Sequence, residues 1–574
     1  MKEEVEVLEK VLLEYDKEWK RSLINWDIPE SINADLSLNI LAISKKKKVD
    51  VIDLAKEIIC KLYYYFPTWT FTSTDTGFIN IKFSLDYYHK LLTSSFWQNW
   101  DWKKKNKEER VIIEYVSANP TGFLHLAHFR QAFVGSALAN IYEFQGYKVT
   151  REYYVNDRGK QIEDLTNSVY YYYHQLLNVQ KKEKKEEEIK YPGTSSHQAA
   201  LFLKRKWKDR FLKLNKKGSI FLRKEILAFM LRKIRLDLGR CRIFFDKWTS
   251  EEDLFQKNKC KIRKTLLEWE KKQFVFWSNN SLFFKSTLNK DDKDRVLIKS
   301  NKEYTYFFND IFYHQEKLSR AERLITVLGP DHHGYIQRLL NACYLLLNCP
   351  NNNITVIMTE MINLLLPEGN KVKFSKRIGN TISLTEALKH IQIDQLRFFC
   401  LEKDHKREIN INEDILKEKQ EKTPLYYIRY AIVRCFQIVK RVQTEEAFQG
   451  VSFDFQKDSL LKNGKDLKIY ALQTIIDDIV AVNIVEKAER NIWNLISQFS
   501  LLLEDIILFN RPYNLVNYLL KLSKNWQAYY QRNIIFDKNE LWVTKQRICL
   551  TKMVQITLCL GLRLLGFDQV ITQM

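Results

Sequence analysis

The chain has 574 residues, 45% of them hydrophobic and nine of them cysteine, which is enough for about three domains without disulfide staples. Its 92 Lys and Arg residues against 70 Asp and Glu leave a formal charge of +22, which favours a polyanionic partner such as nucleic acid. The longest apolar stretch is six residues, far below the ~18 of a membrane span, and the opening MKEEVEVLEK has no apolar signal segment. We therefore expect a cytoplasmic protein that binds no membrane.

The chain begins with a small α+β pattern. Apolar residues at helical spacing predict helices around residues 5–19 and 51–65, and residues 76–83 predict an extended segment. The polar stretch at residues 102–110 indicates a linker. We expect a separate N-terminal domain over residues 1–95.

Two strand–helix–strand patterns follow, and they predict an α/β fold class with a parallel sheet covered by helices. The first is expected at residues 111–116, 124–144 and 147–155, and the second at residues 324–328, 332–347 and 354–358. Ligands of such sheets bind beyond the carboxyl ends of the strands, which places a site just after Val116 and Leu328. We assign this domain to residues 108–395, with an insertion near 165–290.

The end of the chain is dominated by helical patterns. Three of them lie at residues 472–485, 492–503 and 515–530, so we predict an all-α bundle over residues 410–574. The charge run at residues 181–188 is a solvated segment to which we assign no chemistry.

One candidate nucleotide site is the pair of histidines in the sequence HLAH. The two common phosphate-binding glycine motifs are absent, but His125 and His128 stand at a strand-to-helix turn. Unpaired N–H groups at a helix N-terminus and two imidazoles three residues apart suit the phosphates of a nucleoside triphosphate. Two histidines at this spacing are more often incidental, so the pattern alone is weak.

The second candidate is the short basic loop KVKFSKR at residues 371–377, followed by Gly379. A flexible cationic loop can close over polyphosphate and neutralise the charge that builds on a leaving group. Basic loops are common in a chain of charge +22, so this loop alone is also weak.

Taken together and in this order, the two motifs resemble the HIGH and KMSKS signatures of class I aminoacyl-tRNA synthetases. Within that class the chain resembles the arginyl-tRNA synthetases. The resemblance rests on EYVSANPTGFLHLAH, GYKVTREYYVNDRGKQI, DRVLIKSNKEYTYFFNDIFYH, GPDHHGYIQR, KVKFSKRIGNTISL and TPLYYIRYAIVR. It runs from about Asp75 to Met574 and is weak before Glu108 and across residues 165–290.

The resemblance implies a Rossmann-like catalytic domain, an N-terminal domain that contacts tRNA and a helical anticodon-binding domain. It implies that ATP activates L-arginine to arginyl-adenylate with release of pyrophosphate, and that the arginyl group then passes to the 3′-terminal adenosine of tRNA(Arg) with release of AMP. Mg²⁺ would arrive on ATP, and we expect no protein-bound structural metal. A monomer is expected.

The resemblance also assigns site residues. A guanidinium needs carboxylates, and the family's acidic contacts to arginine fall on Glu114 and Asp310. The arginine pocket would be completed by Ser117, Asn119, Tyr306 and Tyr313. The nucleotide would be held by His125, His128, Gly329, Asp331, His332, His333, Ser375 and Lys376. Catalytic stabilisation of pyrophosphate would come from His125, His128, Lys373, Lys376 and Arg377. The tRNA contacts would be Tyr426, Tyr427, Arg429, Tyr430 and Arg434, with Asn80 in the N-terminal domain.

Two residues depart from the family's signatures. Ala127 stands where the family usually has Gly, and Phe374 replaces the usual Met. A methyl group at position 127 would crowd the nucleotide, so we predict weaker ATP affinity without loss of activity.

Three other functions compete with this interpretation. A cysteinyl-tRNA synthetase normally uses bound zinc, for which the chain lacks a Cys/His cluster. A catalytically silent tRNA-binding derivative would not need both histidines, Lys376 and both carboxylates. A small-substrate nucleotidyltransferase would not need the large helical domain or so much positive charge.

Overall fold

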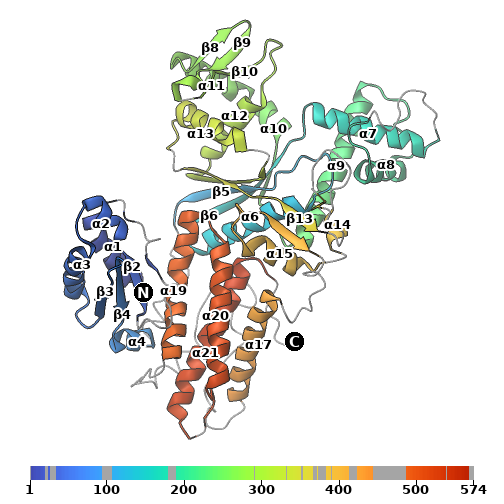
Figure 1. Cartoon of the computed structure of the whole chain (residues 1–574). Helices are drawn as coiled ribbons and strands as arrows, with labels where there is room; N and C mark the ends of the chain where they lie inside the picture. The colour runs from blue at the N-terminus through green and yellow to red at the C-terminus, as the bar shows by residue number, and fades with distance from the viewer. Residues whose placement is uncertain are drawn as a thin grey trace.

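The computed structural model describes most of the chain and shows several bodies around one sheet. The described residues are 2–17, 19, 24–25, 34–92, 107–178, 189–289, 291–330, 333–350, 353–365, 371–372, 383–388, 391–412, 423–443, 487–537 and 539–567. Figure 1 shows a central sheet with a helical arm and a small α+β cap on one side and a long helical bundle on the other. The N-terminal module lies beside the bundle.

The N-terminal module is a four-stranded antiparallel sheet in the order β1-β2-β4-β3, accompanied by helices. The strands are β1 (Ile24–Asn25), β2 (Leu36–Asn39), β3 (Thr70–Ser73) and β4 (Phe78–Lys82), and the helices are α1 (Lys2–Tyr15), α2 (Leu41–Lys47), α3 (Val51–Tyr65) and α4 (Leu85–Leu92). Helix α3 begins where the Asp50 side chain accepts hydrogen bonds from the backbone N–H groups of Ile52 and Asp53. It matches the predicted helix, whereas α1 ends at Tyr15, four residues before the prediction.

The central sheet has five parallel strands in the order β12-β11-β5-β6-β7. They are β5 (Arg110–Tyr115), β6 (Lys148–Val155), β7 (Lys247–Ser250), β11 (Arg323–Leu328) and β12 (Ile354–Met358), and the crossover helices are α6 (Leu126–Phe144) and α13 (His333–Leu347). In chain order β6 and β7 follow β5 on one side of the sheet, and β11 and β12 then add to the other side of β5. Strands β5 and β11 therefore flank the topological switch point, where ligands of such sheets bind.

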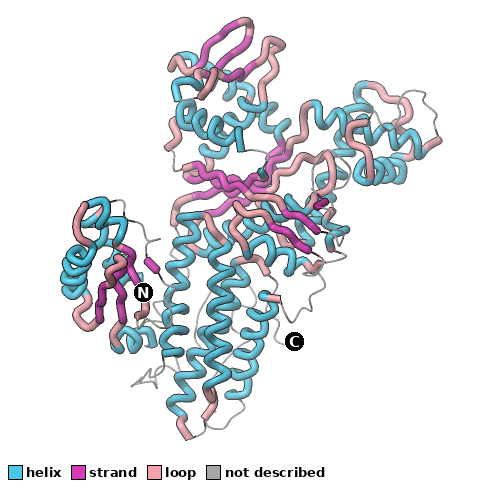
Figure 2. The backbone as a smooth tube through the Cα atoms, in the orientation of Figure 1, coloured by secondary structure: helices cyan, strands magenta, loops and turns pink. Residues whose placement is uncertain are grey.

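The insertion between β6 and β11 forms two bodies, which Figure 2 shows on separate branches. The arm consists of α7 (Lys160–Leu176), α8 (Thr194–Trp207) and α9 (Lys216–Arg240), packed around a core that includes Leu165, Leu203 and Ile226. The cap shares its core with the sheet through Ile112 and Leu324. It contains α10 (Glu251–Lys257), α11 (Lys259–Lys271), β8 (Val275–Ser278), β9 (Ser281–Phe284), the 3-10 turn η3 (Ser286–Asn289), β10 (Arg295–Ile298) and α12 (Tyr306–Leu318).

A second small sheet and short helices connect the central sheet to the bundle. The sheet has the order β14-β13-β15, with β13 (Ile362–Leu365), β14 (Lys371–Val372) and β15 (Ile409–Asn412), and the helices are α14 (Leu384–Ala387) and α15 (Ile393–Glu402). The bundle consists, in the part that the structure describes, of α17 (Pro424–Gln443), α19 (Lys487–Phe509), α20 (Tyr513–Arg532) and α21 (Leu541–Leu564). The helix predicted at 472–485 and the charge run at 181–188 lie outside the described residues.

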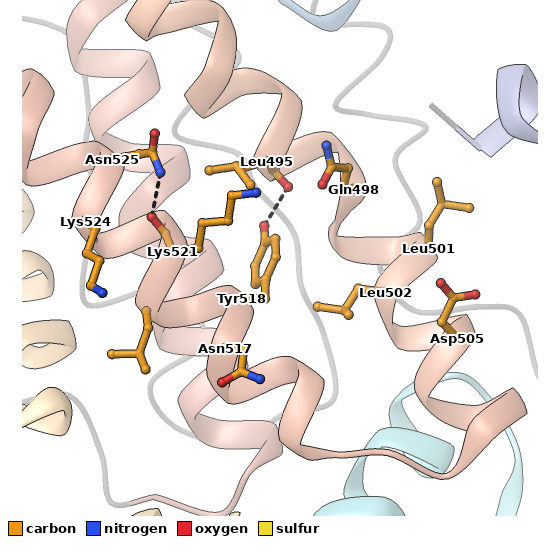
Figure 3. Close-up of a pocket in the computed structure, with 11 residues that line it drawn as sticks. Leu495, Gln498, Leu501, Leu502, Asp505, Asn517, Tyr518, Lys521, Lys524 and Asn525 are labelled. Atoms are coloured by element: carbon orange, nitrogen blue, oxygen red, sulfur yellow. Dashed lines mark hydrogen bonds between the residues drawn. The ribbon is translucent and has the colours of Figure 1, made fainter. Parts of the chain in front are cut away.

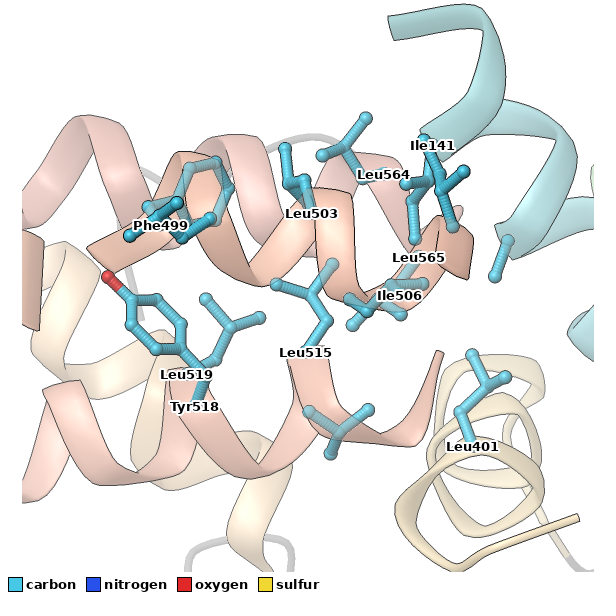
Figure 4. Close-up of a cluster of buried hydrophobic side chains, with 14 of the residues drawn as sticks. Ile141, Leu401, Phe499, Leu503, Ile506, Leu515, Tyr518, Leu519, Leu564 and Leu565 are labelled. Carbon is cyan, nitrogen blue, oxygen red and sulfur yellow. The ribbon is translucent and has the colours of Figure 1, made fainter. Parts of the chain in front are cut away.

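The bundle packs directly on helix α6, the crossover helix between β5 and β6 of the central sheet. Figure 4 shows Ile141 of α6 beside Leu564 and Leu565 at the end of α21 and near Ile506 of α19. Asn140 donates a hydrogen bond to the Leu564 carbonyl at 3.1 Å, and the Tyr142 hydroxyl donates one to the Ile507 carbonyl at 3.1 Å.

Helix α19 is long and apolar enough to cross a membrane by length and composition, but 67% of its most apolar window is buried inside the protein. It is therefore placed as a core helix of the bundle.

Candidate active site

The site begins with a strained turn after β5. Val116 has φ 70° and Ser117 has φ 37°, a left-handed conformation that is costly for a β-branched residue such as Val116. The Ser117 hydroxyl donates to Glu114 Oε1 at 2.9 Å and accepts from the Tyr154 N–H at 3.1 Å, and Tyr153 donates to the Ala118 carbonyl at 2.9 Å. Backbone strain held by surrounding contacts in this way is concentrated at functional sites.

The histidine pair lies at the start of α6. His125 is the N-cap residue, and its backbone N–H donates to Nδ1 of His128 at 3.2 Å. Because Nδ1 of His128 accepts, the neutral ring carries its proton on Nε2. The ring centroids of the two histidines are 3.7 Å apart, so both imidazoles stand at the N-terminus of the helix, where anions bind.

A residue that follows the basic loop in sequence lies beside this pair. Ser383, six positions after Arg377, forms an isolated antiparallel bridge with His125, and Lys371 and Val372 at the start of KVKFSKR pair with β13. The structure thus brings Ser383 to the histidine turn, 258 positions earlier in the chain. Six of the predicted residues lie outside the described residues: Asp331, His332, Lys373, Ser375, Lys376 and Arg377.

Glu114 is part of a buried ion pair that the sequence did not reveal. Its Oε2 lies 2.7 Å from Nζ of Lys317, and both residues are buried. Lys317 stands seven residues after Asp310 on α12, so the two share one face of that helix. This spacing is the only sequence signal that could have drawn attention to Lys317.

Asp310 is the second of the two carboxylates predicted to contact arginine. Its Oδ2 accepts a hydrogen bond from the Tyr335 hydroxyl at 2.5 Å. Burial raises the pKa of Asp310 to about 6, the bond from Tyr335 opposes this rise, and the negative charge of Glu114 adds to it. Since Glu114 acts on Asp310 and is bonded to Lys317 on the same helix face, the two carboxylates lie near one another between β5 and α12.

Tyrosines lie around these charged residues. Tyr313 is buried, its hydroxyl donates to Glu152 Oε1 at 3.0 Å, and its ring lies 4.3 Å from Nζ of Lys317. The Tyr154 ring packs on Tyr313 with centroids 4.4 Å apart. Tyr306 lies on the rim instead, because its side chain is 62% exposed.

Another buried carboxylate near these residues, Glu251, was missed by the sequence analysis. It accepts a hydrogen bond from Asn309 at 2.8 Å. Burial raises the pKa of Glu251 to about 7, Arg158 opposes the rise, and the charges of Asp310 and Asp157 add to it. Glu251 lies within residues 165–290, where the resemblance to the family is weak, so no motif indicated it.

The remaining predicted residues of the pocket are placed as follows. Asn119 donates to Gln161 Oε1 at 2.9 Å. Gly329 directly follows β11, and a Cβ there would lie 2.8 Å from Nε2 of Gln131, so a larger residue would require the end of that side chain to move. His333 is the first residue of α13, and the structure does not describe its side chain.

The predicted tRNA residues on α17 form their own contacts. Tyr426 and Tyr430 stack with centroids 6.3 Å apart, and Arg434 donates to the Tyr430 hydroxyl at 2.8 Å. Arg429 pairs with Asp394 of α15, and the Tyr427 side chain is 37% exposed. In the N-terminal module, the Asn80 side chain accepts a hydrogen bond from Ser37 at 2.8 Å. Their roles in RNA binding stay predictions.

A cavity of about 520 Å³ lies between α19 and α20 of the bundle, as Figure 3 shows. Leu501 and Leu502 give it apolar walls, Asp505 and Lys521 add charge, and the Tyr518 hydroxyl donates to the Leu495 carbonyl at 2.7 Å. It contains none of the residues predicted for catalysis.

Comparisons with known proteins identify the family. Residues 92–434 match the catalytic domain of class I tRNA synthetases (R), and residues 428–574 match the DALR anticodon binding domain. The arginine–tRNA ligase of Listeria monocytogenes serotype 4b (strain F2365) is 32% identical over 495 residues, which cover 85% of this chain and 83% of that protein. That of Bacillus licheniformis is 33% identical over 494 residues, with the same shares covered.

A solved structure supports the architecture. The arginyl-tRNA synthetase of Thermus thermophilus aligns with 99% of this chain and 100% of its own, with a TM-score of 0.70 and 16% identity, a likeness that shows the fold alone. The predicted α/β catalytic sheet and the helical C-terminal domain are thereby confirmed. The chain belongs to the arginine–tRNA ligases, a branch of the class I aminoacyl-tRNA synthetases.

Proposed function

We propose that the described site activates L-arginine with ATP and that the chain then transfers the arginyl group to the 3′-terminal adenosine of tRNA(Arg). The observation that supports the proposal is the closeness of two carboxylates near the switch point: Glu114 is bonded to Lys317, which shares a face of α12 with Asp310. A guanidinium is permanently charged and donates five N–H bonds in a fork, so it requires such carboxylates.

The two acids would bind the guanidinium in different ways, because Lys317 neutralises one of them. Lys317 already neutralises Glu114 at 2.7 Å, so the uncompensated charge that attracts the guanidinium comes from Asp310. Glu114 contributes an oriented oxygen rather than net charge, because Ser117 and Lys317 hold its carboxylate in place. Tyr306 on the rim and Asn119 on the turn would complete the enclosure.

ATP would bind at the N-terminus of α6. His128 Nε2 and the first N–H groups of the helix would hold phosphate oxygens, with His125, Gly329, Asp331, His332, His333 and Ser375 around the nucleotide. Mg²⁺ would arrive on the ATP phosphates, which is its usual mode in nucleotide enzymes. The first step is an in-line displacement in which an arginine carboxylate oxygen bonds to the α-phosphorus as the bond to pyrophosphate breaks. No general base is needed, because the attacking carboxylate is already ionised.

The basic loop would stabilise the leaving pyrophosphate through Lys373, Lys376 and Arg377. The bridge between Ser383 and His125 supports this role, since it fixes a residue six positions after Arg377 to the turn that carries the histidine pair. Removing one such charge contact typically costs about 3 to 4 kcal/mol of activation energy, a hundredfold or more in rate.

The domain division remains part of the proposal. We assign residues 1–95 to a tRNA-contacting module that uses Asn80, 108–395 to catalysis with its insertion near 165–290, and 410–574 to the anticodon. In that last domain the contacts would come from Tyr426, Tyr427, Arg429, Tyr430 and Arg434. We further propose that the protein acts as a cytoplasmic monomer.

The test is arginine-dependent pyrophosphate release, run with and without tRNA. Wild type should release pyrophosphate with arginine, and Lys376→Ala should lose at least a hundredfold in rate. Lys264→Ala, which removes an exposed lysine from α11, is the matched control and should behave as wild type. Release with lysine or glutamate but not arginine would overturn the substrate assignment, and no release with any amino acid would favour a silent tRNA-binding protein.

A further inference from the structure

A buried hydroxyl near the two carboxylates is left without a partner. The Tyr154 hydroxyl is shielded from solvent and has no hydrogen-bond partner in the part of the chain that the structure describes. A buried polar group costs free energy when nothing bonds it, and native proteins leave few such groups. A bond supplied from outside the protein would remove this cost.

Tyr154 lies on the face of the sheet that carries Glu114. Glu152 of β6 pairs in register with Glu114 of β5, and Tyr154 follows two residues later. Because successive residues of a strand point to opposite faces, Tyr154 and Glu152 share a face. Tyr313 of α12 contacts both: its hydroxyl donates to Glu152 at 3.0 Å, and its ring centroid is 4.4 Å from that of Tyr154. Helix α12, which also carries Asp310, therefore covers this face next to Tyr154.

The hydroxyl of Tyr154 is close to several negative charges. Burial raises the pKa of Tyr154 far above its ordinary value of 10, and four carboxylates add to that rise: Glu251, Asp310, Glu114 and Asp157. The phenol therefore stays neutral at physiological pH, and its oxygen can accept a hydrogen bond as well as donate one. An ionised carboxylate only accepts. A ligand with positive charge and N–H donors would suit both the acids and this oxygen.

Asn309 shows the same pattern on α12. Its side chain is 6% exposed, and its Nδ2 donates to Glu251 Oε1 at 2.8 Å. Its Oδ1 has no hydrogen-bond partner among the described residues. Asn309 directly precedes Asp310, so a second uncharged oxygen that lacks a donor lies close to the acids. Both observations favour a donor-rich ligand over an anionic one.

We propose that the Tyr154 hydroxyl accepts an N–H bond from the guanidinium of arginine. The inference rests on the proposed function, in which Glu114 and Asp310 receive that group. A guanidinium points its five N–H donors outward in one plane, so acceptors are needed on several sides of it. Glu114 would supply them from β5, Asp310 from α12 and Tyr154 from β6.

The oxygens of the two acids are already partly occupied, which gives a neutral acceptor its value. Ser117 and Lys317 each donate to one oxygen of Glu114, and Tyr335 donates to Asp310. A third acid in place of Tyr154 would add a negative charge that the single positive charge of the ligand could not balance. A tyrosine adds an acceptor without adding charge.

The experiment is the substitution Tyr154→Phe, which removes one oxygen and keeps the ring against Tyr313. Initial rates of aminoacylation are measured at saturating tRNA with arginine and ATP varied in turn. The KM for arginine should rise about tenfold to a hundredfold, the loss expected for a bond to a charged donor, while kcat and the KM for ATP stay within about twofold. An unchanged KM for arginine would overturn the proposal.

Thermal unfolding without ligands distinguishes a substrate contact from a structural role. Because the hydroxyl has no partner in the described protein, Tyr154→Phe should keep the unfolding midpoint of wild type or raise it. The matched control is Tyr518→Phe in the bundle, whose hydroxyl donates to the Leu495 carbonyl at 2.7 Å. The control should lower the midpoint and keep the KM for arginine of wild type. A midpoint that falls in Tyr154→Phe as it does in the control would overturn the proposal.

An analogue identifies which end of arginine the hydroxyl contacts. Deaminated arginine, 5-guanidinopentanoate, keeps the guanidinium and lacks the α-amino group, and it is used as a competitive inhibitor. Its inhibition constant should rise in Tyr154→Phe by the same factor as the KM for arginine. An inhibition constant equal to that of wild type would place the contact at the α-amino group and overturn the assignment.

The same assays separate this inference from the proposed function. If wild type fails to attach arginine to tRNA, the proposed function is wrong. If wild type attaches arginine and Tyr154→Phe has the same KM for arginine, the assignment of Tyr154 alone is wrong.

Discussion

The use of arginine should depend on pH through Asp310. This carboxyl must be ionised to receive a guanidinium, and burial raises its pKa from 3.8 to about 6. At pH 5 about one-tenth of it is ionised, whereas at pH 7 about nine-tenths is. We therefore expect kcat/KM for arginine, which reports the free enzyme, to fall about tenfold between pH 7 and pH 5, a change of about 1.4 kcal/mol.

The same shift affects stability with the opposite trend. Because the folded pKa lies above the unfolded one, protonated Asp310 favours the folded state. Its contribution to the free energy of unfolding is fully present below pH 3.8 and is lost as the pH rises through about 6. Binding of arginine thus requires the ionised form of Asp310, whereas the folded state is favoured by its protonated form.

Three variants identify the titrating group in initial-rate assays at saturating ATP and tRNA. Tyr335→Phe removes the hydrogen bond that lowers the pKa of Asp310, so the midpoint should move to higher pH. Asp310→Asn should abolish the dependence of kcat/KM for arginine on pH in this range. At pH 7 it should lower kcat/KM by a factor that corresponds to about 2 to 5 kcal/mol. Glu251→Gln is the control for the other carboxyl that titrates in this range, and it should retain the fall near pH 6. A flat profile between pH 5 and pH 8, or a lower midpoint in Tyr335→Phe, would refute the reasoning.

Three further substitutions test the packing of the site. Lys317→Met should lower the free energy of unfolding in urea by about 3 to 5 kcal/mol, because it leaves the charge of Glu114 buried without a counterion. The double variant Lys317→Met, Glu114→Gln should regain most of this free energy. If it does not, the pairing argument is wrong. Gly135→Ala places a Cβ 2.4 Å from Cγ of Tyr115 and should lower the free energy of unfolding by about 1 to 3 kcal/mol, which is measured as a lower thermal midpoint. An unchanged midpoint would show that Tyr115 on β5 moves to make room for the methyl group. Ala127→Gly should lower the KM for ATP, and an unchanged or higher KM would count against crowding of the nucleotide.

The central fold was predictable because each of its units has a strong local pattern. The strand predicted at 111–116 is β5 at Arg110–Tyr115, and the helix predicted at 124–144 is α6 at Leu126–Phe144. Strand β7 was missed because four residues, KWTS, carry too little periodicity to stand out. The strands β1, β2 and β3 of the N-terminal module were missed for the same reason.

The site was predictable only where a motif marked it. Glu114 and Asp310 lie in segments that resemble a known family, and in the structure Glu114 is bonded to Lys317, which shares a helix face with Asp310. The partner of Glu114 could not be foreseen, because Lys317 is 203 positions away and no local pattern encodes a contact across the sheet. Lys373, Lys376 and Arg377 stay predictions, since they lie outside the described residues.

Helix α6 sets a distance as well as a fold. It begins at the histidine pair and reaches the bundle through Asn140 and Tyr142, and its 19 residues span about 28 Å. The helix therefore separates the histidine pair from the end of the bundle that packs on it. One inserted residue would shift the residues after it by about 1.5 Å along the helix axis and about 100° around it, and so would break the bonds of Asn140 and Tyr142 to the bundle.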